Sequence, residues 1–102
     1  MQKEELKALI INNNFINKLR IEMKYDDTEY DLLCKFMGEL KAVIKDDSDI
    51  DKELMLTLYT IPQAVRNIYL QFSDSIDYDE AFIFKLEDSW LELDGLVIDI
   101  LS

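Results

Sequence analysis

Carboxylates are the side chains of this sequence that come closest to a chemical motif. Asp88 and Glu92 stand four residues apart, so a helix would place them on one face. Paired carboxylates can perform acid–base chemistry or hold two metal ions, but bundles that do so also use Glu-x-x-His motifs. The sequence contains no histidine. The pair is therefore interpreted as part of a solvated acidic stripe, and no metal or other cofactor is expected.

A second group of carboxylates, at Asp47, Asp49 and Asp51, alternates as in a calcium-binding loop. An EF-hand also needs glycine at its sixth position and glutamate at its twelfth. Counted from Asp47, these positions hold Lys52 and Leu58. This excludes an EF-hand, and capping of a following helix explains the acids.

Cys34 is the only cysteine, so no disulfide within the chain and no paired-cysteine metal motif is possible. It lies between Leu33 and Phe36 on a helical pattern, which indicates an inert thiol in the core. The absence of histidine also removes Ser-His-Asp and Cys-His catalysis. We therefore expect that the protein is not an enzyme.

The net charge of −11 is unevenly distributed. Residues 1–51 carry twelve acidic and eight basic side chains, a net −4, whereas residues 52–102 carry ten and three, a net −7. Such a surface is repelled by phosphate backbones and anionic lipid, so neither nucleic acid nor membrane is expected as a direct partner. It attracts a basic protein, and the association is faster at low salt.

The 102 residues are expected to form a single acidic helical domain, 1–102. About half of them, 49%, are hydrophobic, and one proline with two glycines favours long regular elements. The charged N-terminus lacks the apolar region of a signal peptide, and the apolar runs are far shorter than a membrane span. A cytoplasmic location is the default expectation.

Apolar periodicity predicts an all-α fold, a compact bundle of five or six helices. Asn12-Asn13-Asn14 interrupts the pattern, so either Asn14 caps a second helix or one kinked helix runs through. Pro62 likewise ends or kinks its helix. The expected helical segments are 2–12, 15–24, 28–45, 50–59, 62–72 and 77–102, with 46–49 and 73–77 as connections.

The other helices are expected to pack around the last of these segments, 77–102. As a helix, it places one apolar seam along a line with Trp90 beside it; the seam comprises Phe82, Leu86, Leu93, Val97 and Ile100. Three more apolar residues, Phe84, Leu91 and Ile98, fall on the far side. A helix that is apolar nearly all round is expected to be wrapped by the other helices.

An alternative for this stretch is an α+β fold, because Asp94-Gly95 is a strong hairpin-turn dipeptide. A hairpin there would put Leu91, Leu93 and Leu96 on one face. The helix is preferred because residues 85–93 are rich in Leu and Glu and the seam persists across Gly95.

Acidic and aromatic residues near the C-terminal segment form the candidate partner-binding surface, because carboxylates pair with Lys and Arg, and tyrosine supplies contact area. Its members are Asp77, Tyr78, Asp79, Glu80, Glu87, Asp88, Glu92 and Asp94. A competing patch consists of Asp46, Asp47, Asp49 and Asp51.

In its size, its charge and its acidic C-terminal half, the whole chain resembles bacterial immunity proteins of the contact-dependent growth inhibition and colicin types. The resemblance implies a cytoplasmic protein, monomeric when free, that neutralises a basic nuclease toxin by binding it stoichiometrically and covering its basic cleft. Two alternatives remain: a helical regulatory or structural adaptor that self-associates, and a nucleic-acid mimic that inhibits a host enzyme.

Overall fold

The computed structural model describes residues 2–45, 52–73 and 79–101, and these residues form helices only. The expectation of an all-α protein is thereby confirmed. Four long helices account for most of the chain, and a short helical segment follows the first of them. The elements are α1 (Lys3–Ile11), α2 (Phe15–Asn17), the π-helix η1 (Lys18–Glu22), α3 (Asp27–Ile44), α4 (Lys52–Phe72) and α5 (Glu80–Leu101).

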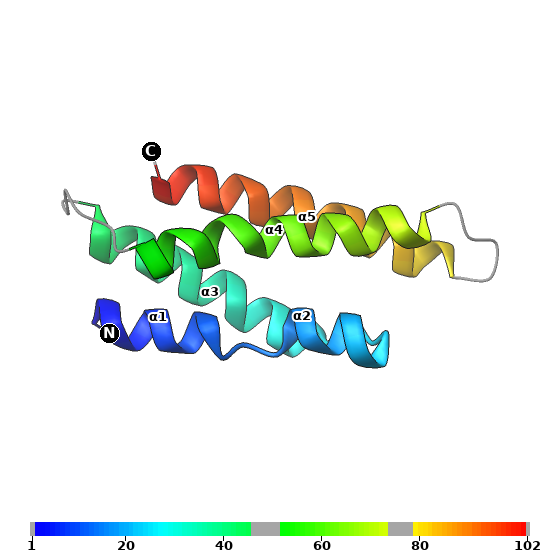
Figure 1. Cartoon of the computed structure of the whole chain (residues 1–102), viewed down its shortest axis with the longest axis horizontal. Helices are drawn as coiled ribbons and strands as arrows, with labels where there is room; N and C mark the ends of the chain where they lie inside the picture. The colour runs from blue at the N-terminus through cyan, green and yellow to red at the C-terminus, as the bar shows by residue number, and fades with distance from the viewer. Residues whose placement is uncertain (1, 46–51, 74–78, 102) are drawn as a thin grey trace.

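The helices form an elongated up-and-down bundle of 46 × 22 × 19 Å (Figure 1). The first arm, made of α1 followed by α2 and η1, runs along one side, and α3 returns beside it. Helix α4 then runs antiparallel to α5, with which it makes the most extensive contact. Because α3 packs against both α1 and α5, it lies at the centre of the chain's packing.

Leucine and isoleucine side chains from every long helix meet in one core. From α5 it receives Leu86, Leu93, Val97 and Ile100, as the seam predicts, with Phe82 partly buried beside them. Beside this core, between α4 and the junction of α1 with α2, the surface has a hollow of about 240 Å³. It is lined mainly by isoleucine side chains and is backed by Leu33 of α3.

Helix α3 begins where its acidic start signal predicts. The Asp26 side chain accepts a hydrogen bond from the backbone N–H of Glu29 at 3.1 Å, which satisfies a free donor of the first turn. Asp27 and Glu29 add negative charge at the positive end of the helix dipole. The same Asp26 carboxylate pairs with Lys18, which ties η1 to this helix start.

Asn14 is the N-cap residue of the second helical segment, as the sequence suggests, but its side chain makes no capping hydrogen bond and Asn13 supplies one instead. The Asn13 side-chain oxygen accepts from the Phe15 N–H at 2.9 Å, and its amide donates to the Glu29 carbonyl at 3.0 Å. The segment continues as the π-helix η1 and ends at Met23, whose φ of 52° is left-handed. Asn13 therefore satisfies a backbone donor at the start of the segment and fixes the segment to α3.

Pro62 neither ends a helix nor separates two, so the expected helices 50–59 and 62–72 are one helix, α4. Proline removes one backbone hydrogen bond, at a cost of about 3 kcal/mol in an exposed helix. Here Pro62 is buried, within an apolar face that includes Leu58 and Val65. Burial of that face offsets the cost, which is why the bundle has fewer separate helices than expected.

Helix α5 is continuous through Gly95, so the hairpin alternative is wrong. A hairpin would bury one side of a two-stranded unit, whereas the helix buries a complete seam against α3 and α4. Tertiary packing thus outweighs the turn preference of Asp94-Gly95.

Gly95→Ala is expected to stabilise the protein by about 1 kcal/mol, because glycine is disfavoured in a helix interior. A methyl group at this position would meet no atom within 4 Å. Gly38, in the middle of α3, has the same open surroundings, so Gly38→Ala is a matched variant with the same expected gain. Urea denaturation measures both, and a loss of stability at Gly95 would contradict the continuous helix.

Candidate protein-binding face

The outward side of α5 carries an exposed apolar stripe. Phe84 is 57% exposed, Leu91 50% and Ile98 58%, and seven-residue spacing puts them on one line of the helix. The expectation that the other helices wrap α5 is therefore wrong. The helix packs on α3 and α4 along neighbouring sides, and its third side is open. Three large apolar side chains in line on an open surface are a feature of interaction sites.

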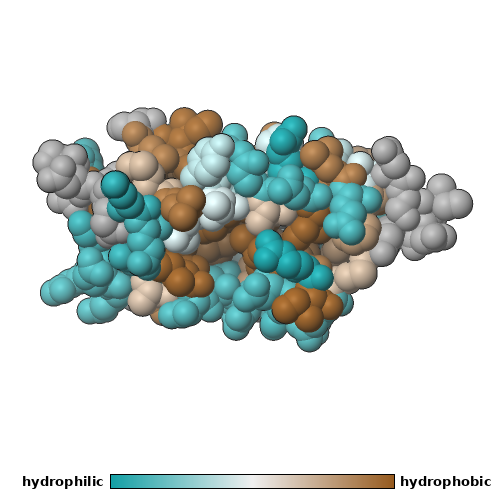
Figure 2. Space-filling model, viewed as in Figure 1, coloured by the Kyte–Doolittle hydropathy of each residue, from teal (hydrophilic) through white to brown (hydrophobic). Residues whose placement is uncertain are grey.

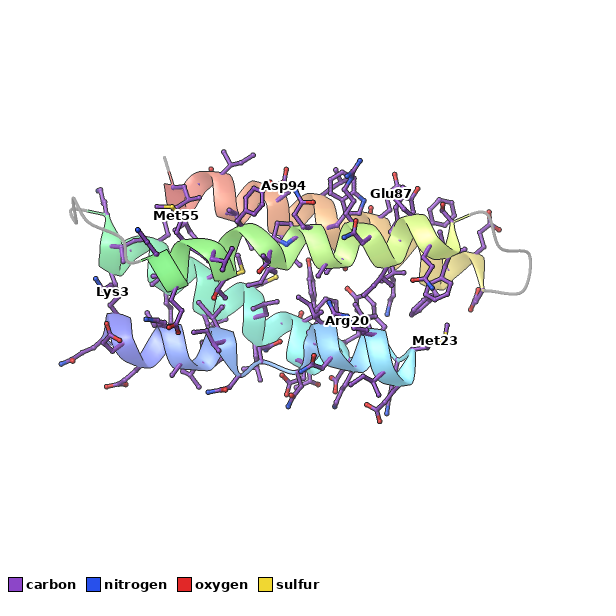
Figure 3. The ribbon with its side chains drawn as sticks, viewed as in Figure 1. Lys3, Arg20, Met23, Met55, Glu87 and Asp94 are labelled. Atoms are coloured by element: carbon purple, nitrogen blue, oxygen red, sulfur yellow. The ribbon has the colours of Figure 1, made fainter. Side chains whose placement is uncertain are left out.

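Carboxylates border this stripe on the side of α4. Glu87 and Asp94 are half-buried there, and the Tyr69 hydroxyl of α4 donates to Glu87 Oε2 at 3.1 Å. Figure 3 shows both acids along the length of α5. The exposed Arg66 of α4 lies over the Trp90 ring of α5, 5.8 Å from its centre. The buried Nε1 of Trp90 has no partner among the described residues.

Carboxylates also border the stripe on the side of α3, but they differ in availability. Asp88 is exposed and Asp99 pairs weakly with Lys41 at 3.9 Å. Glu92 accepts a hydrogen bond from the Tyr30 hydroxyl at 2.5 Å and another from the Cys34 thiol at 3.5 Å. Glu92 is exposed, as Asp88 is, but its carboxylate is engaged in holding α5 to α3.

At its start, α5 exposes Asp79 and Glu80. Asp79 Oδ1 accepts from the Ala81 N–H at 3.0 Å and so caps the helix. The remaining predicted members, Asp77 and Tyr78, lie outside the described residues, as does the competing patch of aspartates at 46–51. The described members of the predicted surface therefore lie along α5, on two flanks separated by the apolar stripe.

A cluster of aromatic and polar side chains joins the first arm to α5. Phe15 contacts the rings of Tyr25 and Tyr30 at centroid distances of 5.1 and 5.0 Å. The Tyr25 hydroxyl hydrogen-bonds the buried Ser89 hydroxyl, which donates to the Lys85 carbonyl at 2.7 Å. The contacts fix α5 against the N-terminal arm.

Burial in this cluster raises the pKa of three groups. It raises the pKa of the Cys34 thiol from 9.0 to about 11, and it raises the pKa of Tyr25. The pKa of Tyr30 is raised by burial and by the hydrogen bond to Glu92. Cys34 is consequently a thiol at neutral pH, in agreement with an unreactive role.

The free energy of unfolding is expected to fall as the pH rises from about 9 to 11. In that window the unfolded chain ionises Cys34 while the folded chain keeps its proton, so ionisation favours unfolding. The two tyrosines act in the same direction above their ordinary pKa of 10.0. Urea denaturation at several pH values checks this, and Cys34→Ala should show a shallower decline. An identical decline in that variant would contradict the assignment.

Helix α4 contributes apolar side chains to the same side of the molecule, and Leu56 among them was not predicted from the sequence. Leu56 is 63% exposed and Tyr59 60%, both on the side of α4 opposite its buried seam. With Met55 and Leu101 they line a hollow of about 390 Å³ where the end of α5 lies beside the start of α4. Figure 2 shows apolar surface gathered at this end. The sequence signal for this surface is the presence of apolar residues on the otherwise polar face of the amphipathic helix α4.

Within the described ranges, no group of three or more His, Cys, Asp or Glu side chains is arranged to hold a metal ion. No described helix has the length and apolar character needed to cross a membrane.

Comparisons with protein-family models, curated proteins and solved structures found no match to this chain. The candidate site is therefore defined by the geometry of α4 and α5 alone.

Proposed function

We propose that this protein binds a basic protein through the outward side of α5 and thereby blocks that protein's activity. The class that fits best is a cytoplasmic immunity protein that neutralises a nuclease toxin. The partner would be captured one to one, and the free protein would be a monomer without enzymatic activity.

The observation that supports the proposal most directly is the stripe of Phe84, Leu91 and Ile98 between two rows of carboxylates. Protein interfaces have an apolar centre and a polar rim, and a few central side chains supply most of the binding energy. Within residues 80–101 there are six acids and one base, Lys85, a net charge of −5. The rim therefore selects a basic partner.

Inhibition follows from the same match between the acidic rim of α5 and a basic partner. A nuclease has a basic cleft because it binds phosphate, and a carboxylate-rimmed helix placed over that cleft excludes the substrate. Long-range attraction accelerates the encounter, and the apolar stripe slows dissociation once the complex has formed.

The test is affinity purification from the source cells at low salt, followed by elution with a salt gradient. Recovery of a basic protein near 1:1, whose toxic or nuclease activity is abolished when the purified protein is added back, would support the proposal. A recovered partner whose activity is unaffected, or the absence of any salt-sensitive partner, would contradict it.

A self-associating adaptor is the second candidate, and the exposed apolar stripe is the observation that favours it. Sedimentation of the purified protein separates the two. An adaptor is an oligomer with little dependence on salt, whereas the proposed inhibitor sediments as a monomer.

A further inference from the structure

The outer sides of α4 and α5 form a continuous face with a hollow at one end. The hollow is lined by Met55, Leu56, Tyr59, Leu101 and the chain of Lys52. Its volume of about 390 Å³ lies within the range of ligand pockets, about 300–1,000 Å³. Figure 3 places Met55 beside the end of α5, so both helices contribute to this hollow.

Apolar residues repeat along this face at the spacing of packed helices. On α5, Phe84, Leu91 and Ile98 recur every seven residues. On α4, Leu56 and Leu70 are fourteen apart and at least half exposed, with the polar Gln63 midway between them. A seven-residue repeat matches two turns of a helix that packs alongside. From Phe84 to Ile98 the α5 stripe advances by fourteen residue steps, or about 21 Å at 1.5 Å per step.

The charge of the face decides what can occupy it. Glu87 and Asp94 are also seven residues apart and lie on the side of α5 that faces α4, where Glu87 contacts Tyr69. Glu80 and Asp88 add charge along the same helix. A second copy of this chain would bring its own carboxylates against these, whereas a helix with Lys or Arg beside its apolar residues would pair with them.

We infer that this face binds one basic amphipathic helix of the partner, and that a large apolar side chain of that helix fills the hollow. The inference rests on the proposed function, because it names the element of the basic protein that α5 recognises. Helix-in-groove recognition of this type uses apolar anchors at i, i+3, i+4 and i+7. Lysines of the bound helix would face Glu87 and Asp94.

A synthetic peptide of about 18 residues, somewhat longer than the stripe, tests the inference. The peptide carries leucines at heptad positions, flanking lysines and one phenylalanine placed to reach the hollow, and a scrambled peptide of equal charge is the control. Titrations follow the fluorescence of Trp90, the only tryptophan, which lies under Arg66 between the two helices. We expect at least tenfold tighter binding of the designed peptide than of the scrambled one.

A double-mutant cycle tests whether the phenylalanine of the peptide is the anchor that fills the hollow. Phe→Ala in the peptide should weaken binding at least tenfold to the native protein but hardly at all to Leu56→Asp, which alters the hollow at an exposed position. Ile21→Asp, on η1, is the matched control and should leave binding unchanged.

The outcomes separate this inference from the proposed function. If Leu91→Asp weakens the peptide but the anchor and Leu56 show no coupling, α5 binds basic proteins and the anchor assignment is wrong. Equal binding of the scrambled peptide overturns the helix as occupant, and concentration-dependent dimers of the protein itself overturn it in favour of a second copy.

Discussion

Leu91→Asp is expected to weaken binding of the basic partner by about 30-fold to 1,000-fold, the range for a residue at the centre of an interface. Leu91 lies in the middle of the apolar stripe. Binding would bury the new carboxylate against the partner and remove its water, which costs free energy. Surface plasmon resonance with the purified partner measures the effect, which should appear mainly in the dissociation rate.

Stability should change by no more than about 0.5 kcal/mol, because Leu91 is half exposed. Ile21→Asp is the control for a new charge at an exposed apolar position, since Ile21 is 77% exposed on η1. Equal weakening by both variants would show that added negative charge, and not the stripe, governs binding.

Phe15→Ala is expected to lower the free energy of unfolding by about 3–5 kcal/mol, a large part of the 5–15 kcal/mol typical of a domain. Phe15 is fully buried and contacts the rings of Tyr25 and Tyr30. Its loss leaves a cavity where the first arm meets α3 and removes support for the Tyr30–Glu92 contact to α5.

Phe84→Ala is the matched control, because it removes the same side chain from a position that is 57% exposed. Its expected cost is within about 0.5 kcal/mol. Guanidinium denaturation of both variants gives the comparison, and similar losses at the two positions would contradict the placement of Phe15 in the core.

The elements that the sequence predicted well have strong local signals. Asp26 and the acids after it define the start of α3, and the seam from Leu86 to Ile100 predicts the buried side of α5. Pro62 misled the prediction because the cost of a helical proline is local, whereas the packing that offsets it comes from other helices. The number of helices was overestimated for this reason.

The candidate site was predicted in part. Its acids could be named from the sequence, but periodicity cannot tell which sides of α5 meet a neighbour. Phe84, Leu91 and Ile98 were expected to be covered, and the hydrogen bonds from Tyr30 and Cys34 to Glu92 could not be foreseen, because both features depend on where α3 lies. Leu56 was not predicted, because its place on this face depends on α4 running beside α5.

The hydrogen bonds that join Tyr25 to Ser89 and Tyr30 to Glu92 impose an order on folding during synthesis. Each links positions more than sixty residues apart, so neither forms until α5 has left the ribosome. At about 5–20 residues per second, α3 is made several seconds before its partner helix. During that interval the sides of α3 and α4 that later meet α5 are open to chaperones, and the nascent chain is most vulnerable to aggregation then.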